Sequence, residues 1–267
     1  MSIPFQGTAW ALSADGVAET SDKLAVSAAE VWTVLAVGTS CCGYLPDRRP
    51  QICFERHIFH RLTQGKFDDG HISDPRPGAY GAPGAHQYER LSLAMAKDRG
   101  AALQSASWGI GQIMGENFVA GGHNSIEDFV IAMMQSEDVQ LAAMSDFLIS
   151  RKLHLALQTH DWAGFAQRYN GPNYAINRYD LRLQAAYQKY SGGSPPDLDV
   201  RATQLYLTYL GFDPGAVDGV AGRRTLTALE EFHRSQSSAA SQLTNAEVAK
   251  QLKTALSYQV AAAGQLV

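Results

Sequence analysis

The segment Ile52-Cys-Phe-Glu-Arg-His-Ile-Phe-His-Arg61 places a carboxylate, that of Glu55, inside an apolar run. A second segment, Ser105-Ala-Ser-Trp-Gly-Ile-Gly-Gln-Ile-Met-Gly115, is a turn rich in Gly and Ser around Trp108. A carboxylic acid in apolar surroundings can keep its proton near neutral pH, as cleavage of a glycosidic bond requires. A glycine-rich turn lets the backbone and a flat aromatic ring approach a sugar closely. Together the two segments predict a cleft that binds a glycan beside an acid.

The composition argues against binding to nucleic acid or insertion into a membrane. The 267 residues are 45% hydrophobic and carry a net charge of −4, so there is no basic field for nucleic acid. The longest apolar runs near the N-terminus, Val31-Trp32 and Val34–Val37, are far shorter than the ~20 residues of a membrane span. The start, Met1 to Gly7, lacks the basic and apolar regions of a signal peptide. We therefore expect synthesis in the cytoplasm without an export signal.

Cysteines and histidines do not form a recognisable disulfide or metal pattern. The cysteines are Cys41, Cys42 and Cys53, an odd number without a C-x-x-C pair, which predicts buried or half-buried thiols. Four histidines lie near the predicted cleft: His57, His60, His71 and His86. Their H-x-x-H spacing lacks a third ligand, and no H-E-x-x-H motif is present. The sequence therefore predicts neither a metal nor another cofactor.

The chain divides at Ser191-Gly-Gly-Ser-Pro-Pro-Asp197, whose composition is that of a linker. It separates a large domain, residues 1–190, from a small domain, residues 198–267. The large domain is predicted to be mainly α-helical with a small β-hairpin. The small domain is predicted to contain three helices, with a tight turn at Val217-Asp-Gly219 between the first two.

Capping and breaking residues predict the elements of the large domain. Ser27-Ala-Ala-Glu30 is a capping box that opens a helix ending near Gly38. Weak alternation over 41–60 predicts a strand or hairpin that carries Glu55. Segment 65–86, rich in Gly and Pro, predicts a long loop, and 87–99 predicts a helix that ends at Gly100.

Three further helices are predicted before the linker. A long one begins at the capping box Ser125–Asp128 and places Glu137 on its apolar stripe, where an Arg partner or an edge position is expected. Asp161 opens the next helix, which Gly171 ends. The last helix carries Ile176 and Tyr187 on one face.

The segment from Val200 to Phe232 closely resembles the type-1 peptidoglycan-binding domain. The shared pattern is a helix, Leu210-Gly-Phe212, the Val-Asp-Gly turn, and then G-x-x-T-x-x-A-L-x-x-F. His233 stands where a Gln is usual. The resemblance implies that residues around the turn bind the cell wall, namely Asp218, Gly219 and Thr225.

The first 190 residues resemble the N-acetylmuramidase domain of modular phage endolysins, in the lysozyme superfamily. The matching stretches are Gly43–Pro50, Phe54–His60, Tyr88–Leu91, Ser105–Gly115, Ser136–Asp138 and Tyr169–Tyr174. The resemblance implies a lysozyme-like α+β fold, peptidoglycan as the partner, and entry to the wall through a holin-type pore. The Gln-Ile and Tyr-Asn-Gly pieces are also similar to the cleft motifs of lytic transglycosylases.

One position departs from the muramidase pattern. Relatives carry a Val-Glu-Thr/Ser segment before a Cys-Gly-Phe-Leu turn, and its Glu ends the first core helix as the general acid. Here the stretch reads Leu35-Ala-Val-Gly-Thr-Ser-Cys-Cys-Gly-Tyr-Leu45, with Gly38 at the position of that Glu. Either the principal acid is missing and activity is reduced, or Glu55 performs the chemistry.

Several side chains have both a functional and a structural interpretation. Trp108 can stack on a sugar or pack in the core, and Gln112 can bind an N-acetyl group. Tyr169 and Asn170 can face the cleft or cap a helix. Glu55 is the first choice for the acid, and otherwise it forms an ion pair with Arg56 or Arg61. The remaining carboxylates considered are Asp47, Glu116, Asp68 and Asp69.

The sequence is compatible with three functions. The first is a hydrolase that cleaves the glycan between N-acetylmuramic acid and N-acetylglucosamine, with an acid and a second carboxylate. The second is a peptidoglycan-binding protein without turnover, because of Gly38. The third is a lytic transglycosylase, which uses a single acid. A monomer is expected in each case.

Overall fold

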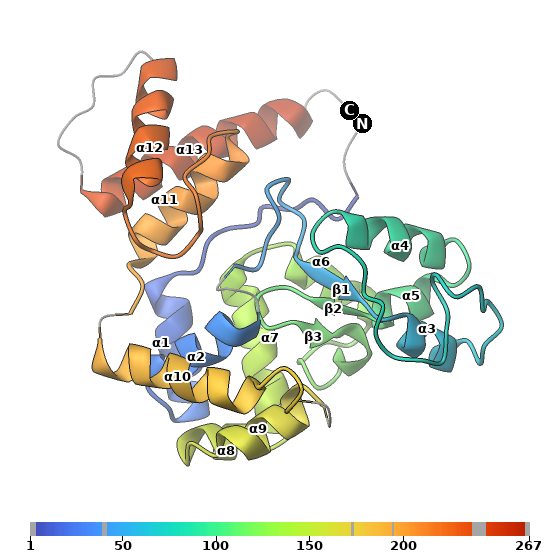
Figure 1. The fold of residues 1–267 in the computed structure, drawn as a ribbon. Coiled ribbons are helices and arrows are strands. Elements are labelled where there is room, and N and C mark those ends of the chain that lie inside the picture. Colours follow the sequence, from blue (N-terminus) through green and yellow to red (C-terminus); the bar gives the residue numbers. More distant parts are fainter. Residues whose placement is uncertain (1–3, 39–41, 172–173, 194, 237–243, 265–267) are drawn as a thin grey trace.

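The computed structural model describes the chain except residues 1–3, 39–41, 172–173, 194, 237–243 and 265–267 (Figure 1). The described part contains thirteen α-helices, one 3-10 helix and three short strands. The helices of the large domain are α1 (Ala14–Leu24), α2 (Ala28–Gly38), α3 (Arg56–Leu62), α4 (His86–Met95), α5 (Arg99–Gln104), η1 (Gly115–Asn117), α6 (Ile126–Met133), α7 (Glu137–Ser150), α8 (His154–Gln158), α9 (Trp162–Tyr169) and α10 (Tyr179–Gly192). The predicted α+β class with mainly helical content is confirmed.

The sheet is small and is contacted by helices α4, α5 and α7. Strands β1 (Ile52–Phe54), β2 (Ala106–Trp108) and β3 (Ile113–Met114) form an antiparallel sheet in the order β1-β2-β3. Ile52 pairs with Trp108 and Phe54 with Ala106, so the two segments that predicted the cleft are hydrogen-bonded neighbours. The strand predicted within 41–60 ends at Phe54, and Glu55 is the N-cap of α3 rather than a strand residue.

Helix α2 lies at the centre of the large domain. Its residues from Glu30 to Leu35 are all buried, as expected for a helix surrounded by other elements. It packs against α10, while α1 packs against α7. The predicted capping box is present, because the Glu30 carboxylate accepts hydrogen bonds from the Ser27 backbone N–H and hydroxyl. As predicted, the helix ends at Gly38, and this brings Gly38 to the protein surface.

Four predicted helix boundaries were wrong. Gly100 lies inside α5, because Asp98 caps a new helix there. The long helix after Ser125 is two helices, since Ser136 provides a second N-cap. Ile176 precedes α10 and is exposed, and α10 continues through Gly192, into the segment predicted as linker.

The predicted loop 65–86 is confirmed and is held in place by α3 and α4. Arg90 donates hydrogen bonds to the carbonyls of His71 and Tyr80, at 2.8 and 2.9 Å. Gln87 donates to the carbonyls of Tyr80 and Ala82 and accepts one from the backbone N–H of Phe54. The loop is therefore fixed against the end of β1, directly before Glu55.

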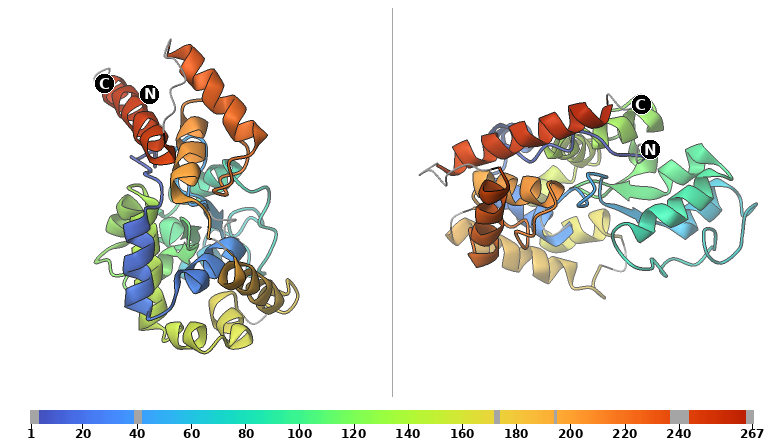
Figure 2. Two further views of the ribbon diagram at one scale, coloured as in Figure 1. Left: turned by 90° about the vertical axis from the view of Figure 1, so that its left-hand side faces the viewer. Right: turned by 90° about the horizontal axis from the view of Figure 1, so that it is seen from above.

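The small domain consists of α11 (Leu198–Tyr209), α12 (Arg223–Ser235) and α13 (Asn245–Gly264), as the three-helix prediction required. Helices α11 and α13 pack together, and Leu205, Leu207, Phe232 and Leu252 form the core. Figure 2 shows the three helices gathered at one end of the molecule, beside the N-terminal segment. That segment is shared, because Ala11 belongs to the small domain's core.

A buried ion pair joins the two domains. Arg201 of α11 donates two hydrogen bonds to the Glu137 carboxylate of α7, at 2.5 and 2.7 Å, and both side chains are 0% exposed. Glu137 also accepts hydrogen bonds from the backbone N–H groups of Leu12 and Gly43, both at 2.8 Å. Every oxygen of this carboxylate is therefore satisfied, and the prediction of an Arg partner for Glu137 is confirmed.

Two further observations concern the predictions from composition. Among the described helices, none is both long and apolar enough to cross a membrane. Cys42 and Cys53 are half-buried, as predicted, while Cys41 lies outside the described residues.

Candidate active site

Glu55 is positioned by the junction of β1 and α3. Its backbone N–H donates to the Ser105 carbonyl at 2.8 Å, and its own carbonyl accepts from Ile58 and Phe59 as α3 begins. The side chain makes no capping hydrogen bond, although Glu55 is the N-cap. Its carboxylate is 22% exposed. The main chain thus holds Glu55 rigidly while the carboxyl group remains accessible.

The surroundings of Glu55 favour its protonated form. Burial, followed by the negative charge of Glu116, raises the pKa of Glu55 to about 6. The nearest cation candidate, His57 Nδ1, lies 3.2 Å from Oε2 but has no hydrogen-bond partner. Burial, together with Arg61, lowers the pKa of His57, so its ring is largely neutral near pH 7. Among the described residues, none donates a hydrogen bond to the Glu55 carboxylate.

Glu116 provides a second carboxylate near enough for its charge to act on Glu55. It lies in η1, directly after β3, and its charge is felt at both Glu55 and His57. Arg61 of α3 donates a hydrogen bond to its Oε2 at 2.5 Å. The two glutamates therefore have different environments: one favours the neutral acid, and the other is a carboxylate paired with a guanidinium.

Gly38 lies at the end of α2, with its backbone in a conformation open to any residue. Among the described residues, a Cβ atom at this position would meet only the Ile110 carbonyl oxygen, at 3.9 Å. Ile110 comes shortly after Trp108, the end of β2 that pairs with Ile52 at the start of β1. Glu55 follows Phe54, at the other end of β1. At about 3.3 Å per strand residue, these two ends are about 10 Å apart. Within the described ranges, a side chain at position 38 therefore meets little obstruction, at the end of β1 opposite Glu55.

Trp108 is a core residue, which corrects its interpretation as a sugar-stacking platform. It is 0% exposed, and its indole N–H donates to the Leu103 carbonyl at 3.1 Å. Its ring packs against Phe5. Its place on β2, between Ile52 and Ile113, directs the side chain into the core.

Gln112 closes the turn between β2 and β3. Its backbone φ is positive, at 48°. Its amide nitrogen donates to the carbonyls of Gly109 and Gln51, and its amide oxygen accepts from the Ser107 hydroxyl. Both ends of the amide are engaged within the protein, so the structure gives Gln112 a role in shaping the turn rather than in binding an N-acetyl group.

Tyr169 and Asn170 end α9 close to the same turn. The Tyr169 hydroxyl donates to the Gly111 carbonyl at 2.5 Å, and its ring stacks on Phe165. Asn170 is the C-cap residue and is half-buried. Tyr169 therefore ties α9 to the β2–β3 turn. The Asn170 side chain forms no hydrogen bond with the described residues.

Tyr80 is a site residue that the sequence did not reveal. It is 44% exposed, and burial and the Glu55 charge both raise the pKa of its hydroxyl. Tyr179, at the start of α10, is near enough to contribute to the same shift. Tyr80 is thus the exposed aromatic ring beside the acid, and its position depends on Gln87 and Arg90. The Tyr88–Leu91 motif contained a signal for this, because Arg90 belongs to it.

The other carboxylates considered from the sequence support loops. Asp47 pairs with Arg49 within a turn. Asp68 bonds to His60 and Ser73, and Asp69 accepts from backbone N–H groups of the loop after it. Within the described residues, no three His, Cys, Asp or Glu side chains are grouped to hold a metal ion.

The residues implied in wall binding surround Gln204 of α11. Its side chain accepts from the backbone N–H groups of Asp218 and Gly219 and donates to the Thr225 hydroxyl and Asp218. Gly219 has φ +75°, and an added Cβ would lie 2.8 Å from Pro196. Gly219 and Thr225 are buried and shape the turn, whereas Asp218 is exposed.

A half-buried acid with a raised pKa, a second carboxylate, and a small sheet against a helical domain define a glycosidase of the lysozyme type. The family model for N-acetylmuramidase matches residues 27–191, which is more than half of the chain. The chain therefore belongs to the N-acetylmuramidase family.

A solved structure agrees with this assignment. The endolysin of the Burkholderia AP3 phage, known from a crystal structure, is similar with a TM-score of 0.62 and 35% sequence identity. The match covers 72% of this chain and 73% of that chain. A search of curated proteins returned no match.

Proposed function

We propose that this protein is an endolysin that hydrolyses the glycan strands of peptidoglycan, between N-acetylmuramic acid and N-acetylglucosamine. The muramidase family and the similarity to a phage endolysin support the substrate and the biological role. The raised pKa of Glu55, about 6, carries the assignment of the acid. The small domain, with its complete Val200–Phe232 pattern, holds the enzyme on the wall, and the protein reaches the wall from the host cytoplasm through a holin-type pore.

In this proposal Glu55 protonates the oxygen of the leaving sugar. Burial raises the pKa of Glu55 to about 6, and the absence of hydrogen bonds to its carboxylate acts in the same direction, so the group holds its proton up to about that pH and can release it to the leaving oxygen. The Glu116 carboxylate stabilises the positive charge that develops on the sugar ring. Tyr80 offers an exposed ring on which a sugar can stack.

Two observations support alternative functions, a lytic transglycosylase and a binding protein. Glu116 is already paired with Arg61, which leaves a single acid free, as a lytic transglycosylase uses. Gly38 leaves empty the position where relatives carry their acid, which favours a binding protein with little turnover.

Mass spectrometry of digested peptidoglycan separates these functions. We expect products with reducing N-acetylmuramic ends, and we expect Glu55→Gln to remove them. Products with anhydro ends would assign the transglycosylase reaction, and wall that binds the protein without being cut would assign the binding function. Free stem peptides would contradict every one of these glycan-based functions.

A further inference from the structure

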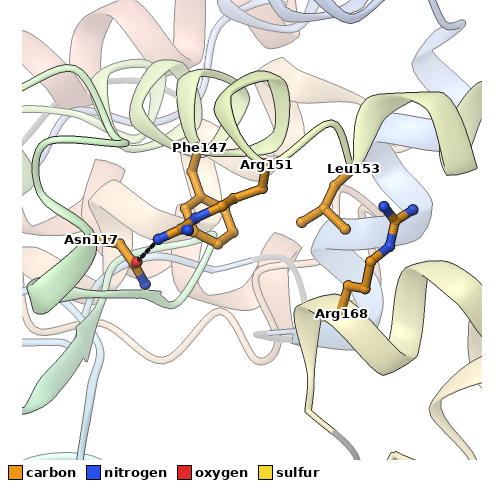
Figure 3. Close-up of a pocket in the computed structure, with 5 residues that line it drawn as sticks. All are labelled: Asn117, Phe147, Arg151, Leu153 and Arg168. Atoms are coloured by element: carbon orange, nitrogen blue, oxygen red, sulfur yellow. Dashed lines mark hydrogen bonds between the residues drawn. The ribbon is translucent and has the colours of Figure 1, made fainter.

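A pocket apart from Glu55 lies between η1, the end of α7 and α9 (Figure 3). It has a volume of about 320 Å³ and is lined by Asn117, Phe147, Arg151, Leu153 and Arg168. Figure 3 shows the two guanidinium groups on either side of Leu153, with Phe147 beside Arg151. The pocket therefore has an apolar floor between two cations.

Neither cation is neutralised by the protein. Arg151 donates to the Asn117 side-chain oxygen at 2.9 Å, and Arg168 donates through Nε to the Gly164 carbonyl at 3.2 Å. Within the described part of the chain, neither forms an ion pair with a carboxylate. By contrast, Arg61 and Arg99 each pair with a glutamate. Guanidinium groups with free N–H donors are suited to carboxylates, which they bind in a bidentate manner.

Two residues that line the pocket are sequence neighbours of residues in the candidate active site. Asn117 lines the pocket and directly follows Glu116, whose charge acts on Glu55. Arg168 directly precedes Tyr169, which bonds to Gly111 in the β2–β3 turn and contacts Phe147. The candidate active site and the pocket therefore share η1, which carries both Glu116 and Asn117.

We propose that this pocket binds the stem peptide of peptidoglycan through its carboxylates. This inference rests on the proposed function, because it requires a glycan with an attached acidic peptide. Two cations separated by Leu153 and Phe147 match a short peptide that carries two carboxylates and small aliphatic side chains. The pocket then selects wall glycan that carries peptides over bare glycan.

The test is a binding measurement by calorimetry on the full chain carrying Glu55→Gln, which prevents turnover. The two ligands are the wall disaccharide with a free-acid stem tripeptide, and the same molecule with its peptide carboxylates amidated. We expect the free acid to bind roughly three- to tenfold more tightly, the range for partly exposed charge-assisted contacts. Arg151→Gln with Arg168→Gln should abolish this difference. Lys152→Gln, which removes a neighbouring exposed cation outside the pocket, should preserve it.

Three results would overturn the inference: equal binding of the two ligands, a preference that survives in the double arginine variant, or no binding of either ligand. Displacement of the free acid by an equal concentration of inorganic phosphate would show a general anion site instead, and would also overturn it. The proposed function is judged separately, from the glycan products of the parent chain, so either can fail alone.

Discussion

Glu55 at the candidate active site is half-buried, and Glu137 at the seam between the two domains is fully buried, but the hydrogen bonds to the two carboxylates differ. At the seam, the Glu137 carboxylate accepts four hydrogen bonds, two of them from Arg201. At the candidate active site, no described residue donates a hydrogen bond to the Glu55 carboxylate, and burial raises its pKa to about 6.

This difference distinguishes a structural carboxylate from a chemical one. A buried charge with all partners in place fixes geometry, and removing one partner leaves an uncompensated charge. A half-buried acid whose carboxylate receives no hydrogen bond keeps its proton up to about pH 6 and can give it to a substrate. Glu137 thus joins the two domains, while Glu55 is available for catalysis.

The largest expected effect is on the rate of wall lysis, and it comes from placing an acid at position 38. We expect Gly38→Glu to raise the rate of wall lysis by about 10²–10⁴-fold, the usual contribution of a correctly placed general acid. In the part of the chain that the structure describes, the Ile110 carbonyl oxygen, at 3.9 Å, is the one atom near a Cβ at Gly38. Helix α2 ends there, and its negative end favours the protonated form of the acid. The measurement is the fall in turbidity of permeabilised Gram-negative cells, at equal concentrations of folded protein.

Gly38→Gln is the matched control for this prediction. It adds a side chain of the same size without an acid, so any gain from stabilising the helix end appears in both variants. Equal rates for the parent and Gly38→Glu would show that position 38 is not an acid site, and would leave the chemistry to Glu55 alone.

At the seam, breaking the pair should lower stability. We expect Arg201→Met to reduce the free energy of unfolding by about 3–5 kcal/mol, because it leaves the Glu137 charge buried without its cation. Urea unfolding at pH 7 measures this loss. Adding Glu137→Gln to Arg201→Met should recover part of it, since no charge then remains buried. A single variant as stable as the parent would contradict the account of Glu137 as a buried, paired charge.

The parts of this molecule that could be predicted from sequence are those with local causes. Ser27 and Asp161 begin helices where their caps predicted, and Glu55 lies in the apolar surroundings that its segment indicated. The small domain followed its motif, with a turn at Gly219 that only the absence of a side chain permits.

The parts that were missed depend on contacts distant in the sequence. Trp108 could not be assigned to the core without knowing that β1 and β3 flank it. The Glu137 partner was expected to be an Arg, but its identity as Arg201 requires the docking of the small domain. Tyr80 comes beside Glu55 because Gln87 and Arg90 hold its loop; Arg90 belongs to the Tyr88–Leu91 motif, but the motif does not show which loop residue it holds.

The smallest expected effect concerns stability in the cleft and depends on pH. The pKa of Glu55 is raised on folding from 4.5 to about 6. Its protonated form therefore contributes stability that is fully present below about pH 4.5 and is lost as the pH rises through about 6. Since the pKa changes by about 1.5 on folding, the ionised carboxylate lowers the free energy of unfolding by up to about 2 kcal/mol above pH 7.

Glu55→Gln cannot ionise, so it should match the parent near pH 4 and exceed its free energy of unfolding by up to about 2 kcal/mol at pH 8. The same substitution at the seam, Glu137→Gln, should destabilise at both pH values, because it weakens the contacts to Arg201. Urea unfolding of the three proteins at pH 4 and pH 8 decides the matter. A difference between parent and Glu55→Gln that does not change with pH would mean that Glu55 is solvated like a surface carboxylate, and the contrast between cleft and seam would be lost.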